Sequence, residues 1–223
     1  MKVQLINYTR DPEKTVAAAA RLCYSDKYGS ELMQDLAQSE IESLIRRLYA
    51  MGHLSPFEHA NFTFSIEGVS RALSHQLVRH RIASYSQKSQ RYVSEDAFEY
   101  VMPPSVFEKD EARATFESAM GKIQAAYKEL SAAIPREDAR YVLPNACETN
   151  VICTFNARSL LNFFKQRCCN RAQWEIRKMA TAMLGEVRKA APIIFEKAGA
   201  ACDAEGYCPE GKMSCGKLKS ESE

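Results

Sequence analysis

Arginine, histidine and hydroxyl side chains are concentrated in one short stretch of this sequence. Arg79, His80 and Arg81 are consecutive, and Ser89 and Arg91 follow within the next ten residues. No Asp or Glu lies between residues 68 and 94. Guanidinium groups pair bidentately with phosphate oxygens, and neutral donors complete such a site. The stretch therefore predicts a phosphate or pyrophosphate site, with a solvated basic loop as the alternative.

A second stretch, residues 149–174, also lacks acidic side chains and contains four basic residues. Together the two stretches carry nine Lys and Arg residues, so the rest of the chain carries a net charge of −7 in a protein whose total is +2. A cleft lined by both stretches would attract a polyanion. Two solvated helix faces are the alternative interpretation.

Arg167 occupies an unusual position in the second stretch. Leu160, Phe163 and Phe164 precede it by seven, four and three residues, so the helical period places Arg167 on an apolar face. A buried arginine needs an anion or several hydrogen-bond acceptors. A side chain that extends along the apolar surface to solvent is the alternative.

The helices and strands that would position these residues are predicted from the spacing of apolar residues and from capping, Gly and Pro residues. Alternating apolar residues predict strands at 2–8 and 61–66, and a β-branched run predicts one at 148–155. Asn156 suits the N-cap of a helix over 157–167, as Asp11 does before Pro12. Residues 82–92 are polar and predict a loop. Further helices are expected at 12–23, from residue 30 or 31 to Gly52, at 69–79, at 106–133, and at 173–199 with a bend at Pro192.

Length and composition limit the class of protein. With 223 residues, 46% hydrophobic and 26% charged, the chain suits one globular domain, expected at 1–200, followed by a polar tail at 201–223 that contains cysteines. We find no run long enough for a membrane span or a signal peptide. Eight cysteines without a secretory signal predict reduced thiols and a cytoplasmic protein.

Four segments in order along the chain resemble the flavin-dependent thymidylate synthases. The string RHRIASYSQKSQRY at 79–92 is similar to the family's signature loop, in which Arg-His-Arg precedes a serine by seven residues. GHLSPFEH at 52–59 resembles its upstream flavin segment, and ARYVLP at 139–144 resembles its nucleotide arginine segment. NARSLLNFFKQR at 156–167, with AQWEI at 172–176, resembles its C-terminal site segment.

This resemblance implies a fold and an activity. The fold would be α/β of the α+β type, with a central antiparallel sheet flanked by helices and a helical lobe. The enzyme would be a methyltransferase of nucleotide biosynthesis that converts dUMP to dTMP. Methylenetetrahydrofolate would supply the carbon, NADPH would reduce the bound FAD, and no cysteine would attack the uracil ring. The family works as a homotetramer with shared active sites, and we expect neither nucleic acid nor membrane as a partner.

The resemblance also implies roles for individual residues. Arg167 would be the catalytic residue, which favours the N3-ionised form of uracil. Flavin contacts would come from His53, Ser55, Glu58, Arg79, His80, Arg81, Gln87, Asn156, Ala157, Arg158 and Asn162. Contacts to dUMP would come from Gln76, Arg79, Gln87, Lys88, Ser89, Gln90, Arg91, Arg140 and Arg167. Each role has a simpler alternative. Asn156 could serve only as an N-cap, and Gln76 and Arg140 could be ordinary surface residues. His53 and Glu58 could serve only in local packing.

The sequence departs from the family at three positions. Gln87 replaces a glutamate of some members, and an amide cannot act as a base. Cys23 and Arg171 replace a serine and a histidine, so no role is assigned to either. No Gly-x-Gly-x-x-Gly motif is present, so FAD is expected outside a Rossmann fold.

Two other classes of protein were weighed against the flavoenzyme. A nucleic-acid-binding module should interleave aromatic residues with basic ones, and only Tyr85 and Tyr92 do so in the first stretch. A metal or redox protein could be built on Cys202, Cys208 and Cys215, but their separations of six and seven positions do not form a tight metal pair. We expect free thiols and no metal.

Overall fold

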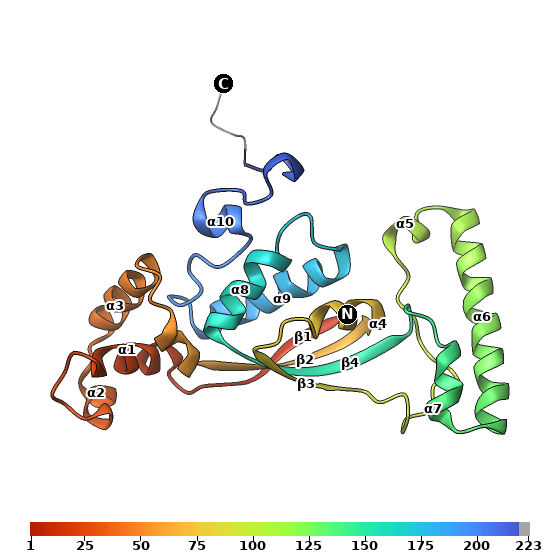
Figure 1. Ribbon diagram of the computed structural model, residues 1–223, viewed down its shortest axis with the longest axis horizontal. Helices are drawn as coiled ribbons and strands as arrows, with labels where there is room; N and C mark the ends of the chain where they lie inside the picture. The colour runs from red at the N-terminus through yellow and green to blue at the C-terminus, as the bar shows by residue number, and fades with distance from the viewer. Residues whose placement is uncertain (219–223) are drawn as a thin grey trace. The chain divides into compact units, whose positions relative to one another are not determined.

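The computed structural model describes residues 1–218. Within them four strands form one open antiparallel sheet in the order β1–β2–β4–β3 (Figure 1). The strands are β1 (Lys2–Tyr8), β2 (Asn61–Ser70), β3 (Ala83–Gln87) and β4 (Glu148–Asn156). The three predicted strands are confirmed, and the α+β class is confirmed with them.

Helices make up most of the remaining described chain. The α-helices are α1 (Pro12–Leu22), α2 (Gly29–Asp35), α3 (Gln38–Ala50), α4 (Arg71–Leu77), α5 (Pro104–Phe107), α6 (Asp110–Ala133), α7 (Arg136–Ala139), α8 (Ala157–Arg167), α9 (Trp174–Ala190) and α10 (Ala201–Glu205). Three short 3₁₀ helices are η1 (Ser55–His59), η2 (Arg140–Val142) and η3 (Gly211–Met213). No helix among residues 1–218 has the length and apolarity needed to cross a bilayer.

The described chain divides into two compact units, each built from separate stretches of sequence. Unit 1 contains residues 1–2, 66–79 and 85–152, and unit 2 contains residues 3–65, 80–84 and, in the described part of the chain, 153–218. Each strand of the sheet contributes residues to both units, because the divisions fall within β1, β2, β3 and β4.

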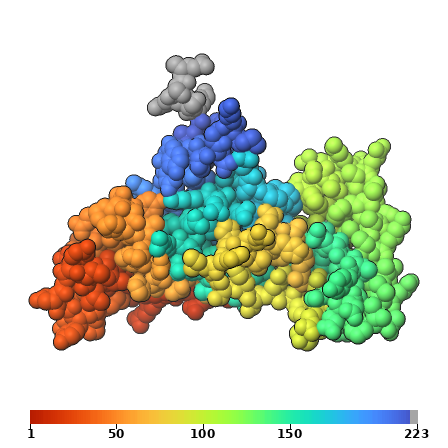
Figure 2. Space-filling view, viewed as in Figure 1, coloured from red at the N-terminus to blue at the C-terminus, as the bar shows by residue number. Residues whose placement is uncertain are grey.

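The core of unit 2 is aromatic. On its part of the sheet, Phe62 and Phe64 of β2 and Phe155 of β4 are buried, at every second residue as a half-buried strand requires. Phe163 of α8 packs on Phe155 with ring centroids 5.6 Å apart, and Phe195 contacts Phe62 at 5.2 Å. Helices α8 and α9 contact each other. The blue C-terminal segment lies against the cyan segment that begins with α8 (Figure 2).

Unit 1 has a smaller core beside the long helix α6. Phe98, Met120 and Cys147 are buried together, and Tyr100 and Phe116 pack against them. Helix α6 also contacts α5, α7 and η2, which are grouped with it in Figure 1. These contacts hold the α7–η2 segment, which contains Arg140.

Five local predictions differ from the structure. Residues 83–87 form β3 rather than a loop, since the strand's outer position in the sheet order suits polar side chains. The predicted helix over 173–199 ends at Ala190, because Pro192 has no N–H to continue it. The helices expected at 30–52 and 106–133 are each split in two, at residues 36–37 and 108–109. Asp11 is the N-cap residue of α1, but its carboxylate accepts no capping hydrogen bond, and its φ of 49° is left-handed.

Candidate active site

The side chains of His80 and Arg167 form the most specific contact of unit 2. Arg167 Nε donates a hydrogen bond to His80 Nε2 at 3.0 Å, across 87 residues of sequence. The imidazole of His80 packs edge-on against Phe163, with centroids 4.8 Å apart. Because Nε2 accepts this bond, the proton of a neutral His80 lies on Nδ1.

Burial and charge keep His80 neutral. Burial, and after it the positive charge of Arg167, lowers the pKa of His80 to about 4. Burial also lowers the pKa of Arg167, but a guanidinium remains protonated in proteins. Arg167 has no carboxylate within 4.0 Å among residues 1–218. A cation is therefore held beside a neutral ring, with its charge available to an anionic ligand.

Helix α8 explains how Arg167 is positioned. Asn156 Oδ1 accepts a hydrogen bond from Ser159 N at 2.8 Å, so the predicted N-cap is confirmed. Leu160, Phe163 and Phe164 are buried, and Arg167 at the last turn is half-buried. The predicted apolar face is therefore correct, and Arg167 lies at its end.

A second group of the predicted flavin-contact residues lies on and beside the exposed side of α8. Arg158 and Asn162 are four residues apart and both exposed. Arg158 Nη1 lies 2.6 Å from Glu58 Oε1 of η1, an ion pair in which each side chain is about half exposed (53% and 48%). Ala157 is buried and its N–H donates to Ala60 O at 2.8 Å. The structure thus brings residues 58–60 against the start of α8.

The remaining predicted residues of unit 2 lie on the surface. His53 is exposed just before η1, and Ser55 begins that 3₁₀ helix. Arg81 is exposed, and no carboxylate of the described chain pairs with it. These side chains are positioned by short local elements and not by burial.

In unit 1, Gln87 is fixed by two hydroxyl groups. Its Nε2 donates to Ser74 Oγ at 2.9 Å and to Thr149 Oγ1 at 3.3 Å. Ser74 belongs to α4 and Thr149 to β4, so Gln87 connects α4, β3 and β4. The amide N–H₂ of Gln87 is occupied within the fold, which leaves its oxygen for a ligand contact.

Two of the basic residues of the signature loop have acidic partners. Lys88 Nζ lies 3.0 Å from the carboxylate of Glu95, which is only 3% exposed. Arg91 Nη2 lies 2.7 Å from Glu137 Oε2, where both side chains are half exposed. The Lys88 pair is largely removed from solvent, whereas the Arg91 pair can exchange its partner. Sequence reasoning identified Lys88 and Arg91 but not Glu95 or Glu137.

The other predicted residues of unit 1 surround the same loop. Ser89 Oγ accepts from Arg91 N at 3.2 Å, and Gln90 Nε2 donates to Cys147 Sγ at 3.6 Å. Arg140 Nε donates to Glu137 O at 3.1 Å. Its guanidinium has no carboxylate partner among the residues described.

Arg79 lies outside the helix that was expected over 69–79. Helix α4 ends at Leu77, so Arg79 lies beyond its last turn, although Arg79 N still donates to Gln76 O at 3.3 Å. Gln76 Nε2 donates to Ala72 O at 3.4 Å. Arg79 is exposed and has no acidic partner in the described part of the chain.

Comparison with known proteins identifies a family that covers most of the chain. A family model described as "Thymidylate synthase complementing protein" matches residues 4–193. The chain is 50% identical to a flavin-dependent thymidylate synthase of Clostridium tetani, over 97% of this chain and 94% of that protein. The chain belongs to the flavin-dependent thymidylate synthases.

Other members of the flavin-dependent thymidylate synthases show similar coverage. The relative from Geobacter sulfurreducens is 54% identical over 97% of this chain and 94% of its own length. The relative from Pyrococcus abyssi is 43% identical over 96% of this chain and 91% of its own. The sequence match therefore extends beyond the four motifs.

Arg71 is a residue of this synthase that sequence reasoning did not single out. Its Nη2 donates to Lys88 O at 2.7 Å, which fixes the backbone where β3 ends. Its Nε is buried without a hydrogen-bond partner, and burial lowers the pKa of the side chain. In the sequence, only its position in the stretch without acidic residues, 68–94, could have pointed to Arg71 as a site residue.

Proposed function

We propose that this chain uses FAD to methylate dUMP to dTMP, with methylenetetrahydrofolate as carbon donor and NADPH as reductant. The observation that carries the proposal is the guanidinium of Arg167. A neutral His80 accepts its Nε–H at 3.0 Å, and no carboxylate of residues 1–218 neutralises it. An anion formed on a bound substrate is the partner this arrangement lacks.

The donors of unit 2 fit a flavin nucleotide. Arg81 offers an unpaired guanidinium for a phosphate, and Arg158 and Asn162 offer donors on one face of α8. The N-terminus of α8 adds a partial positive charge, which favours a pyrophosphate. His53, Ser55 and Glu58 lie in or beside η1, and we assign them to the ring end of the flavin. Bound FAD would supply the reducing equivalents of the reaction.

The donors of unit 1 fit the phosphate of dUMP. Arg140 is unpaired by any described carboxylate, and Arg91 can leave Glu137 for a phosphate because both side chains are half exposed. Ser89 and Gln90 add neutral donors from the same loop, as phosphate sites require. Lys88 contributes less, because its ammonium lies on the buried Glu95.

Arg167 would act on the uracil ring. Loss of the N3 proton increases the electron density on the ring carbon that accepts the one-carbon unit. A fixed guanidinium beside the imide lowers the pKa of N3–H and stabilises the resulting anion. His80 orients the guanidinium through Nε, which leaves the two terminal nitrogens for the ligand.

This chemistry needs no cysteine nucleophile, and the buried thiols suit none. Burial raises the pKa of Cys147 to about 11 and of Cys153 to about 12. At neutral pH both are thiols, whereas attack on a ring requires the thiolate.

The family resemblance supports further assignments. We propose a cytoplasmic homotetramer in which active sites are shared between subunits, with Gln76, Arg79 and Gln87 near the nucleotides. The test is direct: the purified chain should contain FAD and form dTMP from dUMP only when both methylenetetrahydrofolate and NADPH are present. A colourless protein that forms no dTMP when given all four compounds would overturn the proposal.

A further inference from the structure

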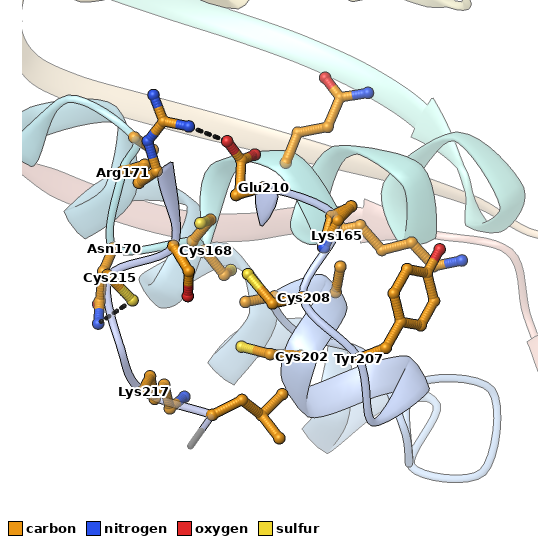
Figure 3. A pocket seen from close by; sticks show the side chains of 18 of the residues that line it. Lys165, Cys168, Asn170, Arg171, Cys202, Tyr207, Cys208, Glu210, Cys215 and Lys217 are labelled. Atoms are coloured by element: carbon orange, nitrogen blue, oxygen red, sulfur yellow. Dashed lines mark hydrogen bonds and ion pairs between the residues drawn. The ribbon is translucent and has the colours of Figure 1, made fainter. Parts of the chain in front are cut away.

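A pocket of about 480 Å³ in unit 2 lies beside Arg167, between the loop that follows α8 and the C-terminal segment, residues 200–218 (Figure 3). Five cysteines line it, namely Cys168, Cys169, Cys202, Cys208 and Cys215. The other cations of its wall, Lys165, Arg171 and Lys217, already form ion pairs with acidic side chains of the C-terminal segment. This five-cysteine pocket therefore points to no particular ligand, whereas a buried ion pair in unit 1 bears directly on the proposed reaction.

The side chains of Lys88 and Glu95 close a loop in unit 1. Lys88 Nζ lies 3.0 Å from the carboxylate of Glu95. Ser89 O accepts a hydrogen bond from Val93 N at 3.0 Å, so the chain turns back between the two charged residues. The ion pair therefore joins the two ends of the loop 89–94. This loop contains three of the donors proposed for the phosphate of dUMP: Ser89, Gln90 and Arg91.

The Lys88 end of the loop is also fixed at the backbone. Lys88 N donates to Asn150 O of β4 at 3.0 Å, and Lys88 O accepts from Arg71 Nη2 at 2.7 Å. Arg71 is the first residue of α4. The sheet and α4 thus hold Lys88 at the point where the loop begins, and Glu95 holds the end of its flexible side chain.

The Glu95 end of the loop is held by α6 and by the core of unit 1. Glu95 is 3% exposed, and its N–H donates to the hydroxyl of Tyr127 at 3.4 Å. Tyr127 belongs to α6 and is fully buried. Phe98 N donates to Glu95 O at 3.1 Å, and Phe98 is a member of the buried cluster beside α6. A carboxylate removed from water needs a partner of opposite charge, and Lys88 supplies it.

Arg71 is a second cation that responds to this carboxylate. Burial lowers the pKa of Arg71, and the negative charge of Glu95 is one of the influences that raise it. Glu95 therefore acts on Lys88 in two ways. It holds the ammonium group directly, and it stabilises the charged guanidinium that binds the carbonyl of Lys88.

We propose that Glu95 is a positioning residue for the phosphate of dUMP. It closes the loop 89–94 through Lys88, so that the donors of the loop are arranged for one phosphate before the nucleotide binds. A loop ordered in advance loses less entropy on binding, and affinity rises without a further contact. In this arrangement the ammonium group of Lys88 connects the loop to Glu95 and need not touch the phosphate. The inference rests on the proposed function, because it concerns the same dUMP site.

The experiment is calorimetric titration of the full FAD-containing chain with dUMP, and of the flavin-free chain with FAD. Glu95→Gln keeps the size of the side chain but removes the charge that holds Lys88. Its dUMP binding should weaken about tenfold, which corresponds to the ordering of one or two side chains. Its FAD affinity should not change, because the donors assigned to FAD phosphate lie in unit 2. A general loss of structure would weaken both.

Glu67→Gln is the matched control. Glu67 of β2 also pairs with a lysine of unit 1, Lys2, at 3.7 Å, but its side chain is 45% exposed. The same chemical change at this exposed ion pair should leave the affinities for dUMP and FAD as they are in wild type.

Lys88→Met and the double variant Lys88→Met/Glu95→Gln distinguish positioning from a direct contact between Lys88 and phosphate. If the two side chains act as a unit, the two single variants and the double variant should weaken dUMP binding by similar factors. If Lys88 instead binds phosphate directly, Glu95→Gln releases its ammonium group and dUMP binding tightens.

Unchanged or tighter dUMP binding by a folded Glu95→Gln chain would overturn the proposal, and so would additive effects of the two replacements. If Glu95→Gln does not fold, the double variant decides, because it leaves neither charge of the pair behind. Wild-type dUMP affinity in that double variant would overturn the proposal. A wild-type chain that binds no dUMP would refute the proposed function itself and this inference with it, so the two failures are distinguishable.

Discussion

Arg167 Nε donates to His80 Nε2 at 3.0 Å, and this bond joins the end of α8 to the Arg-His-Arg segment. His80, from the Arg-His-Arg segment, therefore holds the guanidinium of Arg167, which belongs to the C-terminal site segment. Phe163 supports the ring of His80 from the edge, and burial keeps that ring neutral. His80 is therefore a positioning residue for Arg167, in addition to any contact it makes with flavin.

Stability should depend on pH through His80. Its folded-state pKa, about 4, lies below the ordinary value of 6.5, so the unfolded chain binds the proton first as the pH falls. Stability present at pH 7 should be lost between about pH 6.5 and pH 4. At pH 5 we expect a loss of about 1 kcal/mol, reduced from the full shift because the ring is half-buried and partly screened.

Urea unfolding of wild type and His80→Gln at pH 7 and pH 5 measures this loss. The glutamine oxygen can still accept from Arg167 but does not titrate. The variant should lose about 1 kcal/mol less between the two pH values. An equal loss in both proteins would show that His80 contributes nothing to the pH dependence.

Flavin binding should depend on Arg81. A charge-assisted contact to phosphate contributes about 1.5–3 kcal/mol, so Arg81→Ala should weaken FAD binding roughly tenfold or more. Titration of the flavin-free protein with FAD gives the affinity. Arg113→Ala, which removes a partly exposed arginine of α6 paired with Asp110, is the control. Equal FAD affinity in the Arg81 variant and wild type would contradict the placement.

Single Cys→Ser replacements should retain dTMP formation at all eight positions, because the proposed reaction needs no thiolate on the ring. The measurement is turnover with saturating dUMP, after FAD and dUMP binding have been verified. A replacement that binds both normally yet forms no dTMP would identify a nucleophile and refute the mechanism.

The proposed assembly is a tetramer. Light scattering of the purified protein should give about four times the 25.1 kDa chain mass. Because the proposed active sites are shared between subunits, activity per chain should fall on dilution below the dissociation constant of the tetramer. A fully active monomer would rule out shared sites.

Elements with a clear hydrophobic period were predictable from sequence. Phe62, Phe64 and Ile66 alternate along β2, and Leu160, Phe163 and Phe164 mark the buried face of α8. Strand β3 was missed because its less exposed positions hold Ala83, Tyr85 and the polar Gln87, so the apolar alternation that identifies a half-buried strand is weak. Its position at the end of the sheet order makes that composition tolerable.

The pairings between distant residues were less predictable. Composition and motif spacing identified His80, Arg91 and Arg167, but not their partners. Glu137 lies 46 residues from Arg91, and only folding brings the two together. The five-cysteine pocket was missed for the same reason, since Cys168 and Cys169 lie far from the tail cysteines in sequence.

The role of Arg167 is tested by dTMP turnover of the Arg167→Lys enzyme at saturating dUMP, beside Arg113→Lys as a control. Lysine keeps the charge but loses the planar set of donors that reaches both His80 and the substrate. We predict that FAD binding and the fold are retained while turnover falls about 10²–10³-fold, the usual cost of removing one preorganised donor. Near-normal turnover of Arg167→Lys would show that the guanidinium does not activate the uracil ring.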